Sequence, residues 1–225
     1  MKNIAIIPAR GGSKRLPNKN ILLFDGIPLL AHSILYAQNN LSIIDDIFVT
    51  TDSPEIKRVA LEYGAKVIDR PESISGDFEP TISALKHAVQ LVGDQVENVI
   101  LLQVTNPLRP AKLLAEAFEI FQKEQKDSLF TVTRDFKKLG KIINHRFLPF
   151  NYKIGQRSQD LEPLFFENGL LYISKSKLIL DDILISENAY PLEINHPFAS
   201  IDIDTKDDLE QAQFFAKNYK NYYNK

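Results

Sequence analysis

Short apolar runs rich in isoleucine and valine recur along the chain, and longer segments with apolar residues at helical spacing separate them. A run that is apolar at successive positions is typical of a strand buried on both faces of a sheet. Five such runs lie at residues 4–7, 47–51, 66–68, 99–102 and 129–132. The pattern therefore predicts a sheet whose two faces are both covered.

The segments between these runs predict helices. Apolar residues recur at helical spacing at residues 29–37, 53–63, 81–92 and 111–123, and several of these segments follow a Pro, Ser or Thr that suits a helix start. Strands that alternate with helices indicate an α/β fold with a doubly wound, mostly parallel sheet and right-handed crossovers. In such folds, ligands bind at the carboxyl ends of the strands.

The alternation weakens after residue 134. Residues 135–166 are mixed and polar, and glycines and prolines interrupt them, which does not fit the core of a doubly wound sheet. We interpret this segment as an inserted arm that serves as a lid or an oligomer contact, because long irregular insertions are often functional. The sheet pattern resumes at residues 170–173 and 199–203, and a helix capped by Thr205 and Asp208 is expected to close the domain. A single domain over residues 1–225 is thus expected.

Composition excludes several classes of chemistry. The chain has no cysteine, which excludes disulfides, thiolate catalysis and cysteine-based metal sites, and its four histidines show no metal-ligand spacing. The net charge of -2 gives no overall attraction to nucleic acid or to an anionic membrane. No apolar run approaches the roughly 20 residues that cross a bilayer. The first residues lack the long apolar region of a signal peptide, so we expect a cytoplasmic protein.

A loop of small and basic residues follows the first strand. Residues 10–19 contain two glycines, the Ser13 hydroxyl and four cations, Arg10, Lys14, Arg15 and Lys19. Glycines bring backbone N–H groups close to an anion, and Arg and Lys donate charge-assisted hydrogen bonds to phosphate oxygens. The loop matches neither G-x-x-x-x-G-K-[ST] nor G-x-G-x-x-G. Its place at the end of a strand favours binding of nucleotide phosphates over a solvated turn.

Two aspartates lie two residues apart near the end of the chain. Asp202 and Asp204 share one face of the predicted strand, and Ile201 and Ile203 share the other. Paired carboxylates without histidine or thiolate suit Mg²⁺, which keeps water ligands and bridges to substrate phosphates. The alternative is a solvent-facing strand edge before a helix cap. Beside a phosphate-binding loop, the pair is the expected metal partner.

Polar residues also flank two other predicted strands. Gln103 follows a buried run, and its amide both donates and accepts, which suits sugar hydroxyls. Thr105 and Asn106 equally suit a simple turn before a proline. Asn168 begins an Asn-Gly pair that is also compatible with a turn, and Tyr172 is typical of a half-buried strand aromatic.

Together these motifs resemble those of the acylneuraminate cytidylyltransferases, also called CMP-sialic acid synthetases. The match follows the right order over nearly the whole chain. It comprises Ile-Pro-Ala-Arg-Gly-Gly-Ser-Lys at 7–14, Asn-Lys-Asn at 18–20, Arg-Pro at 70–71, Leu-Leu-Gln at 101–103, Asn-Gly at 168–169 with Tyr172, and Ser-Ile-Asp-Ile-Asp-Thr at 200–205. The resemblance implies a nucleotide-diphospho-sugar transferase-like fold with an inserted dimerisation arm at about residues 135–166.

The resemblance also implies a reaction. The anomeric hydroxyl of a nonulosonic acid, a nine-carbon 2-keto sugar acid, would attack the α-phosphate of CTP and give a CMP-sugar and pyrophosphate. Mg²⁺ would be the cofactor, and the enzyme would be a homodimer. Nucleotidyl transfer asks the protein chiefly to align the attacking oxygen and to neutralise charge on the phosphates, which agrees with the residues described above.

Residue roles follow from the resemblance by matching position. Nucleotide contacts fall on Ala9, Arg10, Gly11, Ser13, Lys14, Lys19, Asn20, Arg70, Asp77 and Thr81. Sugar-acid contacts fall on Gln103, Asn168 and Tyr172 and, from the arm of the facing subunit, on Arg157 and Gln159. Catalysis falls on Arg10, Lys19, Asp202 and Asp204, and the two aspartates would carry Mg²⁺.

Two departures from the family leave the sugar open. The strand end reads Leu-Leu-Gln-Val-Thr-Asn-Pro where a common family form is Leu-Leu-Gln-Pro-Thr-Ser-Pro, and Phe-Glu-Asn-Gly at 166–169 replaces the Arg-Pro-Asn-Gly of some sialic acid enzymes. Legionaminic and pseudaminic acids are therefore alternatives. Asn-Lys-Asn at 18–20 disfavours the Kdo type, whose members usually continue Arg-Leu-Pro-Gly-Lys. A non-catalytic nucleotide-sugar binding protein would lack a phosphate cation or an aspartate, and this chain has all of them.

Overall fold

The side chains of β1 (Lys2–Pro8) alternate between two hydrophobic cores. Ile4 and Ile6 pack on one face of the sheet, Ala5 and Ile7 pack on the other, and all four are fully buried. Because neighbouring residues of a strand point to opposite faces, such a strand needs cover on both sides. The first apolar run of the sequence is therefore part of a sheet between two layers of helices.

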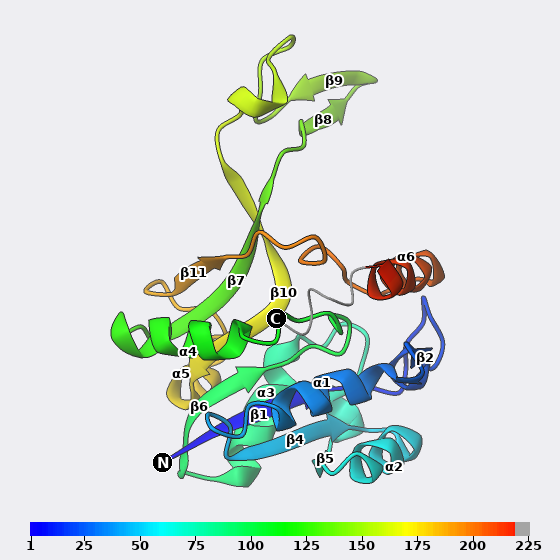
Figure 1. Cartoon of the computed structure of the whole chain (residues 1–225), viewed down its shortest axis with the longest axis vertical. Helices are drawn as coiled ribbons and strands as arrows, with labels where there is room; N and C mark the ends of the chain where they lie inside the picture. The colour runs from blue at the N-terminus through cyan, green and yellow to red at the C-terminus, as the bar shows by residue number, and fades with distance from the viewer. Residues whose placement is uncertain (219–225) are drawn as a thin grey trace.

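The two helical layers divide the chain's helices between them (Figure 1). On the face of Ile4 and Ile6 lie α3 (Thr81–Val92) and α5 (Ser176–Leu180). On the opposite face lie α1 (Leu29–Gln38), α2 (Pro54–Glu62), α4 (Leu113–Lys123) and α6 (Lys206–Asn218). The helices predicted between the strands are confirmed, and the short α5 is an addition to them.

The computed structural model describes residues 1–218, and its central sheet has seven strands in the order β11-β7-β10-β6-β1-β4-β5. Besides β1, these are β4 (Asp46–Thr51), β5 (Lys66–Asp69), β6 (Val96–Leu101), β7 (Ser128–Asp135), β10 (Leu164–Lys175) and β11 (Tyr190–Glu193). Neighbouring strands are parallel except at β10, which runs antiparallel to both β6 and β7. The predicted doubly wound, mostly parallel α/β fold is confirmed.

Side-chain caps begin two helices where the sequence predicts them. At α2, Ser53 Oγ accepts a hydrogen bond from the N–H of Ile56 at 3.4 Å. At α6, Thr205 Oγ1 accepts from the N–H of Asp208 at 3.3 Å, while Asp208 Oδ2 accepts from the N–H of Thr205 at 2.8 Å. The second pair is the reciprocal capping box expected before the last helix.

The predicted strand at residues 199–203 is wrong, and the edge strand of the sheet is β11 instead. Ile201 and Ile203 are buried, as their alternation predicts. However, Asn106 Nδ2 donates to the carbonyl oxygen of Ile201 at 2.8 Å, and the N–H of Ile203 donates to the carbonyl oxygen of Thr105 at 2.9 Å. The segment thus lies against the loop that follows β6, where these few hydrogen bonds replace a strand ladder.

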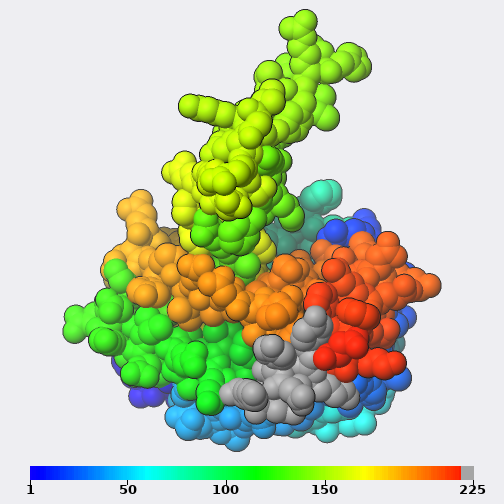
Figure 2. All heavy atoms as spheres, turned by 45° about the horizontal axis from the view of Figure 1, so that its top comes forward, coloured from blue at the N-terminus to red at the C-terminus, as the bar shows by residue number. Residues whose placement is uncertain are grey.

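Strands β7 and β10 extend beyond the body of the sheet and carry the predicted arm (Figures 1 and 2). The arm contains a hairpin of β8 (Gly140–Ile143) and β9 (Arg146–Pro149), which form a separate two-stranded sheet. Of the twenty large apolar side chains that residues 1–218 expose, ten lie on this arm, between Phe136 and Phe166. Such a concentration of exposed apolar side chains is typical of an interaction surface.

The remaining elements are short. They are β2 (Leu23–Phe24), β3 (Ile27–Pro28), η1 (Lys19–Ile21), η2 (Glu72–Ile74) and η3 (Ser158–Asp160). Within residues 1–218, no helix has the length and apolar character needed to span a membrane.

Replacing Asn106 by alanine tests how the segment at 199–203 is held. Asn106 is 1% exposed, and its amide also donates to the carbonyl oxygen of Asn168 at 3.1 Å. The change Asn106→Ala leaves two buried carbonyl groups without this partner. We therefore expect a loss of about 2–4 kcal/mol in the free energy of unfolding, measured by urea denaturation.

The matched control is Asn195→Ala. Asn195 is exposed and donates to Glu193 at 3.1 Å on the surface. We expect this change to cost less than about 0.5 kcal/mol. Equal losses for the two variants would contradict a structural role for the Asn106 amide.

Candidate active site

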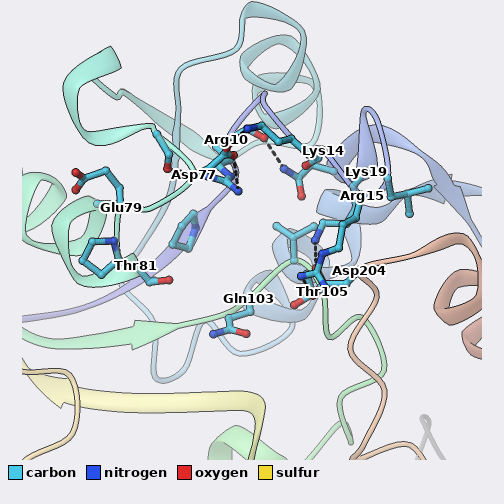
Figure 3. A pocket seen from close by; sticks show the side chains of 18 of the residues that line it. Arg10, Lys14, Arg15, Lys19, Asp77, Glu79, Thr81, Gln103, Thr105 and Asp204 are labelled. Atoms are coloured by element: carbon cyan, nitrogen blue, oxygen red, sulfur yellow. Dashed lines mark hydrogen bonds and ion pairs between the residues drawn. The ribbon is translucent and has the colours of Figure 1, made fainter.

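A cleft of about 650 Å³ opens at the carboxyl ends of β1 and β6. Four parts of the chain line it: residues 10–20, residues 70–84, residues 103–105, and Asp202 with Asp204. Figure 3 shows ten of the lining residues with labels. The fold thus gathers the basic loop, a strand-end glutamine and the paired aspartates around one space.

Hydrogen bonds and close packing hold the basic loop in place. The N–H of Gly11 donates to Asp52 Oδ1 at 2.9 Å, and a Cβ atom at Gly11 would lie 3.0 Å from the Cβ of Ser53. Asn20, which is buried, donates through Nδ2 to the carbonyl oxygen of Arg10 at 2.8 Å. The close approach of Ser53 therefore favours glycine at position 11. The polar loop residues that line the cleft are Arg10, Ser13, Lys14, Arg15, Lys19 and Asn20.

Asp77 binds two of the loop's cations. Arg10 Nη2 lies 3.2 Å from Asp77 Oδ1, and Lys14 forms a second ion pair with the same carboxylate. Arg10 Nη1 also donates to the carbonyl oxygen of Gly76 at 2.7 Å. The Lys14 ammonium holds the pKa of Asp77 below its usual range. These contacts join the basic loop to the segment before α3 (Figure 3).

Asp204 binds the other two cations. Lys19 Nζ lies 2.6 Å from Asp204 Oδ1, and Arg15 Nη2 lies 2.5 Å from Asp204 Oδ2. The side chain of Lys19 is 13% exposed, whereas that of Arg15 is 69% exposed. Because water screens an exposed ion pair more strongly, the Lys19 pair contributes more to the site than the Arg15 pair.

Asp202 lines the same cleft without a salt bridge to any of residues 1–218. Desolvation raises the pKa of its carboxyl group, although the residue keeps more than a third of its surface exposed. The neighbouring charge of Asp204 raises this pKa further, while a hydrogen bond from the Thr105 hydroxyl opposes the shift. An anion in this position is stabilised by an additional cation.

This donor set fits Mg²⁺. The described part of the chain holds no group of three or more His, Cys, Asp or Glu side chains able to bind a metal ion. Mg²⁺ does not need such a cage, because it is usually held by one or two carboxylates together with water and substrate phosphates. Asp202 and Asp204 supply those two carboxylates beside a basic loop.

Arg70 and Thr81 also line the cleft. Arg70 Nη2 donates to the carbonyl oxygen of Thr50 at 2.5 Å, which fixes the guanidinium at the end of β4. Burial lowers the pKa of Arg70. Thr81 is the first residue of α3. The structure thus brings both predicted nucleotide contacts next to the basic loop.

Gln103 lines the cleft, whereas Asn168 and Tyr172 do not. The Asn168 side chain is buried and accepts a hydrogen bond from the Thr131 hydroxyl at 2.5 Å. The Tyr172 side chain is 5% exposed and donates to Glu167 at 3.1 Å. Both residues therefore shape β10 behind the cleft wall in this structure.

Three further predicted contacts lie outside the cleft of their own chain. Arg157 and Gln159 are on the arm, where Arg157 donates to Asp160 through Nε at 2.7 Å and Nη2 at 3.0 Å. Ala9 is 1% exposed and donates through its N–H to the carbonyl oxygen of Thr50 at 3.0 Å. Ala9 thus supports the loop from the core.

The structure adds polar and aromatic lining residues to which the sequence assigns no site role. Each lies within two positions of an assigned residue, but an irregular loop has no periodicity from which the direction of a side chain follows. They are Phe78, Glu79 and Thr105.

Comparison with known proteins identifies the family. The family model described as Cytidylyltransferase matches residues 4–225. The chain belongs to the cytidylyltransferase family. It is therefore a nucleotidyltransferase.

Three relatives cover nearly all of this cytidylyltransferase. A pseudaminic acid cytidylyltransferase of Campylobacter jejuni is 36% identical over 96% of this chain and 97% of its own length. A CMP-N,N'-diacetyllegionaminic acid synthase of Legionella pneumophila is 35% identical over 91% of this chain and 92% of its own length. An N-acylneuraminate cytidylyltransferase of Streptococcus agalactiae is 34% identical over 93% of this chain, which spans 52% of that relative.

A solved structure shares the fold. It is a CMP:2-keto-3-deoxy-manno-octonic acid synthetase complexed with CTP, with a TM-score of 0.71 over 96% of this chain and 99% of that chain. The identity is 17%, so the likeness concerns the fold alone.

Two adjacent glycines offer a matched test of the basic loop. Gly11→Ala places a Cβ atom 3.0 Å from Ser53 and displaces the loop, whereas a Cβ atom at Gly12 has no neighbour within 4 Å. We expect Gly11→Ala to weaken CTP binding by at least about tenfold in calorimetric titration, because small displacements of binding groups are costly. Gly12→Ala should bind CTP like the unchanged enzyme. Equal weakening by both changes would contradict the role of close packing behind Gly11.

Proposed function

We propose that this cytidylyltransferase transfers CMP from CTP to the anomeric hydroxyl of a nonulosonic (sialic-type) acid. A bond forms between the anomeric oxygen and the α-phosphorus, the bond from the α-phosphorus to pyrophosphate breaks, and the hydroxyl proton leaves. The observation that carries this proposal is the convergence of basic side chains and two aspartates on one cleft. Such a site neutralises phosphate charge and aligns the attacking oxygen.

The basic loop is proposed to bind the triphosphate. Arg10, Lys14 and Lys19 supply positive charge, and Ser13 supplies a hydroxyl, all on the cleft wall. Charge-assisted hydrogen bonds from these groups to phosphate oxygens are about twice as strong as neutral ones. Arg70 and Thr81 are proposed to contact the nucleotide from elsewhere on the cleft wall. Ala9, Gly11, Asn20 and Asp77 are proposed to hold the loop that meets it.

Mg²⁺ is proposed to bind at Asp202 and Asp204. The support is the chemistry of the donor set and the unfavourable charge on Asp202, whose pKa is raised by desolvation. When bound, the ion supplies positive charge beside the phosphates. Lys19 and Arg15 orient the Asp204 carboxylate through their ion pairs.

The arm is proposed to form a homodimer and to complete the site of the facing subunit. Its exposed apolar side chains support a contact with a second copy. Arg157 and Gln159 lie on the arm, outside the cleft of their own chain. An exposed arginine suits two-point recognition of the sugar carboxylate. Within the chain's own cleft, Gln103 is proposed to contact the sugar acid, with Asn168 and Tyr172 behind it.

The relatives favour a nonulosonic acid over Kdo. Proteins named for pseudaminic, diacetyllegionaminic and acylneuraminic acids are 36%, 35% and 34% identical to this chain. The protein named for 2-keto-3-deoxy-manno-octonic acid shares the fold at 17% identity. The cytoplasmic location expected from the sequence is kept as part of this proposal.

Pyrophosphate release from CTP tests the function directly. The enzyme is supplied with N-acetylneuraminic, legionaminic, pseudaminic or Kdo acid in separate reactions with Mg²⁺. We expect release with at least one of the three nonulosonic acids. Release with none of the four acids would contradict the catalytic proposal, and release with Kdo alone would contradict the substrate class.

Lys19→Ala tests the phosphate assignment. This change removes a shielded cation from the cleft, so we expect the KM for CTP to rise by about tenfold or more. The matched control is Lys86→Ala, which removes one ion pair, to Asp182 at 2.7 Å, outside the cleft. An unchanged KM for CTP in Lys19→Ala would contradict the assignment.

Asp202→Asn tests the metal assignment. The amide keeps the size of the side chain but removes the anion, so we expect kcat to fall by about 100-fold or more with no loss of folded structure by circular dichroism. Asp207→Asn, an exposed change in the first turn of α6, is the control and should leave kcat unchanged. Full activity of Asp202→Asn at low Mg²⁺ would exclude this carboxylate as a ligand.

A further inference from the structure

Arg109 is a buried cation behind the wall of the cleft. It is 3% exposed, and its guanidinium donates to three groups on three different elements. Nε donates to the carbonyl oxygen of Leu170 at 2.6 Å, Nη1 to Ser33 Oγ at 3.1 Å, and Nη2 to the carbonyl oxygen of Gln103 at 2.5 Å. It thus connects the carboxyl end of β6 to β10 and to α1.

No carboxylate among residues 1–218 forms an ion pair with this guanidinium. The guanidinium lies over the face of the Tyr36 ring, whose centroid is 5.7 Å from Arg109 Cζ. Burial lowers the pKa of Arg109 to about 10, so the side chain stays charged at neutral pH. A buried charge without a counter-ion is unfavourable for folding, and an apolar side chain of similar volume is often better tolerated. Its presence behind a cleft wall therefore calls for a functional explanation.

Two donors, the Arg109 guanidinium and the Ser33 hydroxyl, hold the backbone of Gln103. The Gln103 carbonyl oxygen accepts from Arg109 and also from Ser33 Oγ at 3.2 Å, while the Gln103 side chain lines the cleft. Arg109 also holds Leu170, directly after Gly169. Gly169 has a φ of +74°, and a Cβ atom there would lie 2.9 Å from Gln103 Oε1. Two donors thus fix the Gln103 backbone, and the turn of β10 at Gly169 lies close to its side-chain oxygen.

In Figure 3, Gln103 lies on the side of the cleft opposite to Arg10 and Lys14. We therefore expect the phosphates to bind at the basic loop and the sugar acid to bind beside Gln103. The positively charged guanidinium of Arg109 lies behind that side and donates directly to the Gln103 carbonyl oxygen. In an environment of low dielectric constant, a buried charge acts on a bound anion with little screening.

We infer that Arg109 is a positioning residue for the sugar acid. It fixes the backbone that carries the Gln103 amide, and its charge lowers the free energy of the anionic acid bound there. This inference rests on the proposed function. A purely structural role would instead lower stability and the active fraction without changing one KM selectively.

Four variants separate these roles. Arg109→Gln removes the charge and most of the hydrogen bonds, and Arg109→Lys keeps the charge but loses the planar fork. Ser33→Ala keeps the charge but removes one bond to Gln103 and the acceptor of Arg109 Nη1. Arg58→Gln, an exposed change in α2 that breaks an i,i+4 pair, is the control. For each, KM for CTP, KM for the best sugar acid, kcat and the urea midpoint are measured.

We expect Arg109→Gln to raise the KM for the sugar acid by about tenfold or more and the KM for CTP by less than about threefold. Arg109→Lys should fall between Arg109→Gln and the unchanged enzyme, with a similar urea midpoint to Arg109→Gln. Ser33→Ala should raise the KM for the sugar acid by about threefold without changing that for CTP. Arg58→Gln should change neither constant.

Equal rises in both KM values, or equal effects of Arg109→Lys and Arg109→Gln, would overturn the inference while leaving the proposed function intact. If Arg109→Gln does not fold, Arg109→Lys and Ser33→Ala carry the test, and an unchanged sugar-acid KM in both overturns it. Absence of turnover by the unchanged enzyme with every acid would overturn the proposed function and, with it, this inference.

Discussion

The buried amide of Asn106 holds together three parts of the chain that are far apart in sequence. It lies directly after the strand end of β6 and donates to the backbone at Asn168 and at Ile201. Without this contact, nothing in the sheet ladder would place the segment of Asp202 and Asp204 beside the basic loop, because that segment is not a strand. The acidic side of the cleft is therefore held by the Asn106 amide together with the hydrogen bond from Ile203 to Thr105 and the burial of Ile201 and Ile203.

The same cleft distributes its charges in pairs. Asp77 binds Arg10 and Lys14, and Asp204 binds Arg15 and Lys19, so each carboxylate connects the basic loop to another wall. Such pairs hold flexible side chains near the positions in which they act and reduce the reorganisation that binding requires. Asp202 differs because no salt bridge neutralises it within residues 1–218, and this difference supports the proposal that a cation binds there.

Sequence reasoning predicted the sheet, the principal helices and the basic loop, because each of these features is determined by residues that lie close together in the sequence. It was wrong about a strand at residues 199–203. The alternation of apolar and polar residues there predicts that Ile201 and Ile203 are buried, but not which groups form hydrogen bonds with their backbone. The resemblance assigns Asn168 to the sugar acid; in the structure its side chain accepts a hydrogen bond from Thr131, and the assignment stays a prediction. Buried polar contacts between distant strands leave no local signal, and the role of Arg109 is of this kind.

We propose that the cleft directs the anomeric oxygen of a sugar acid to the α-phosphorus of CTP. Turnover of a sugar acid labelled with ¹⁸O at the anomeric hydroxyl tests this claim most directly, with the product analysed by ³¹P NMR and mass spectrometry. We expect the label to be retained in the bond between the sugar and the CMP phosphorus and to be absent from pyrophosphate. Loss of the label from the CMP-sugar, or its appearance in pyrophosphate, would contradict attack by this oxygen at the α-phosphorus.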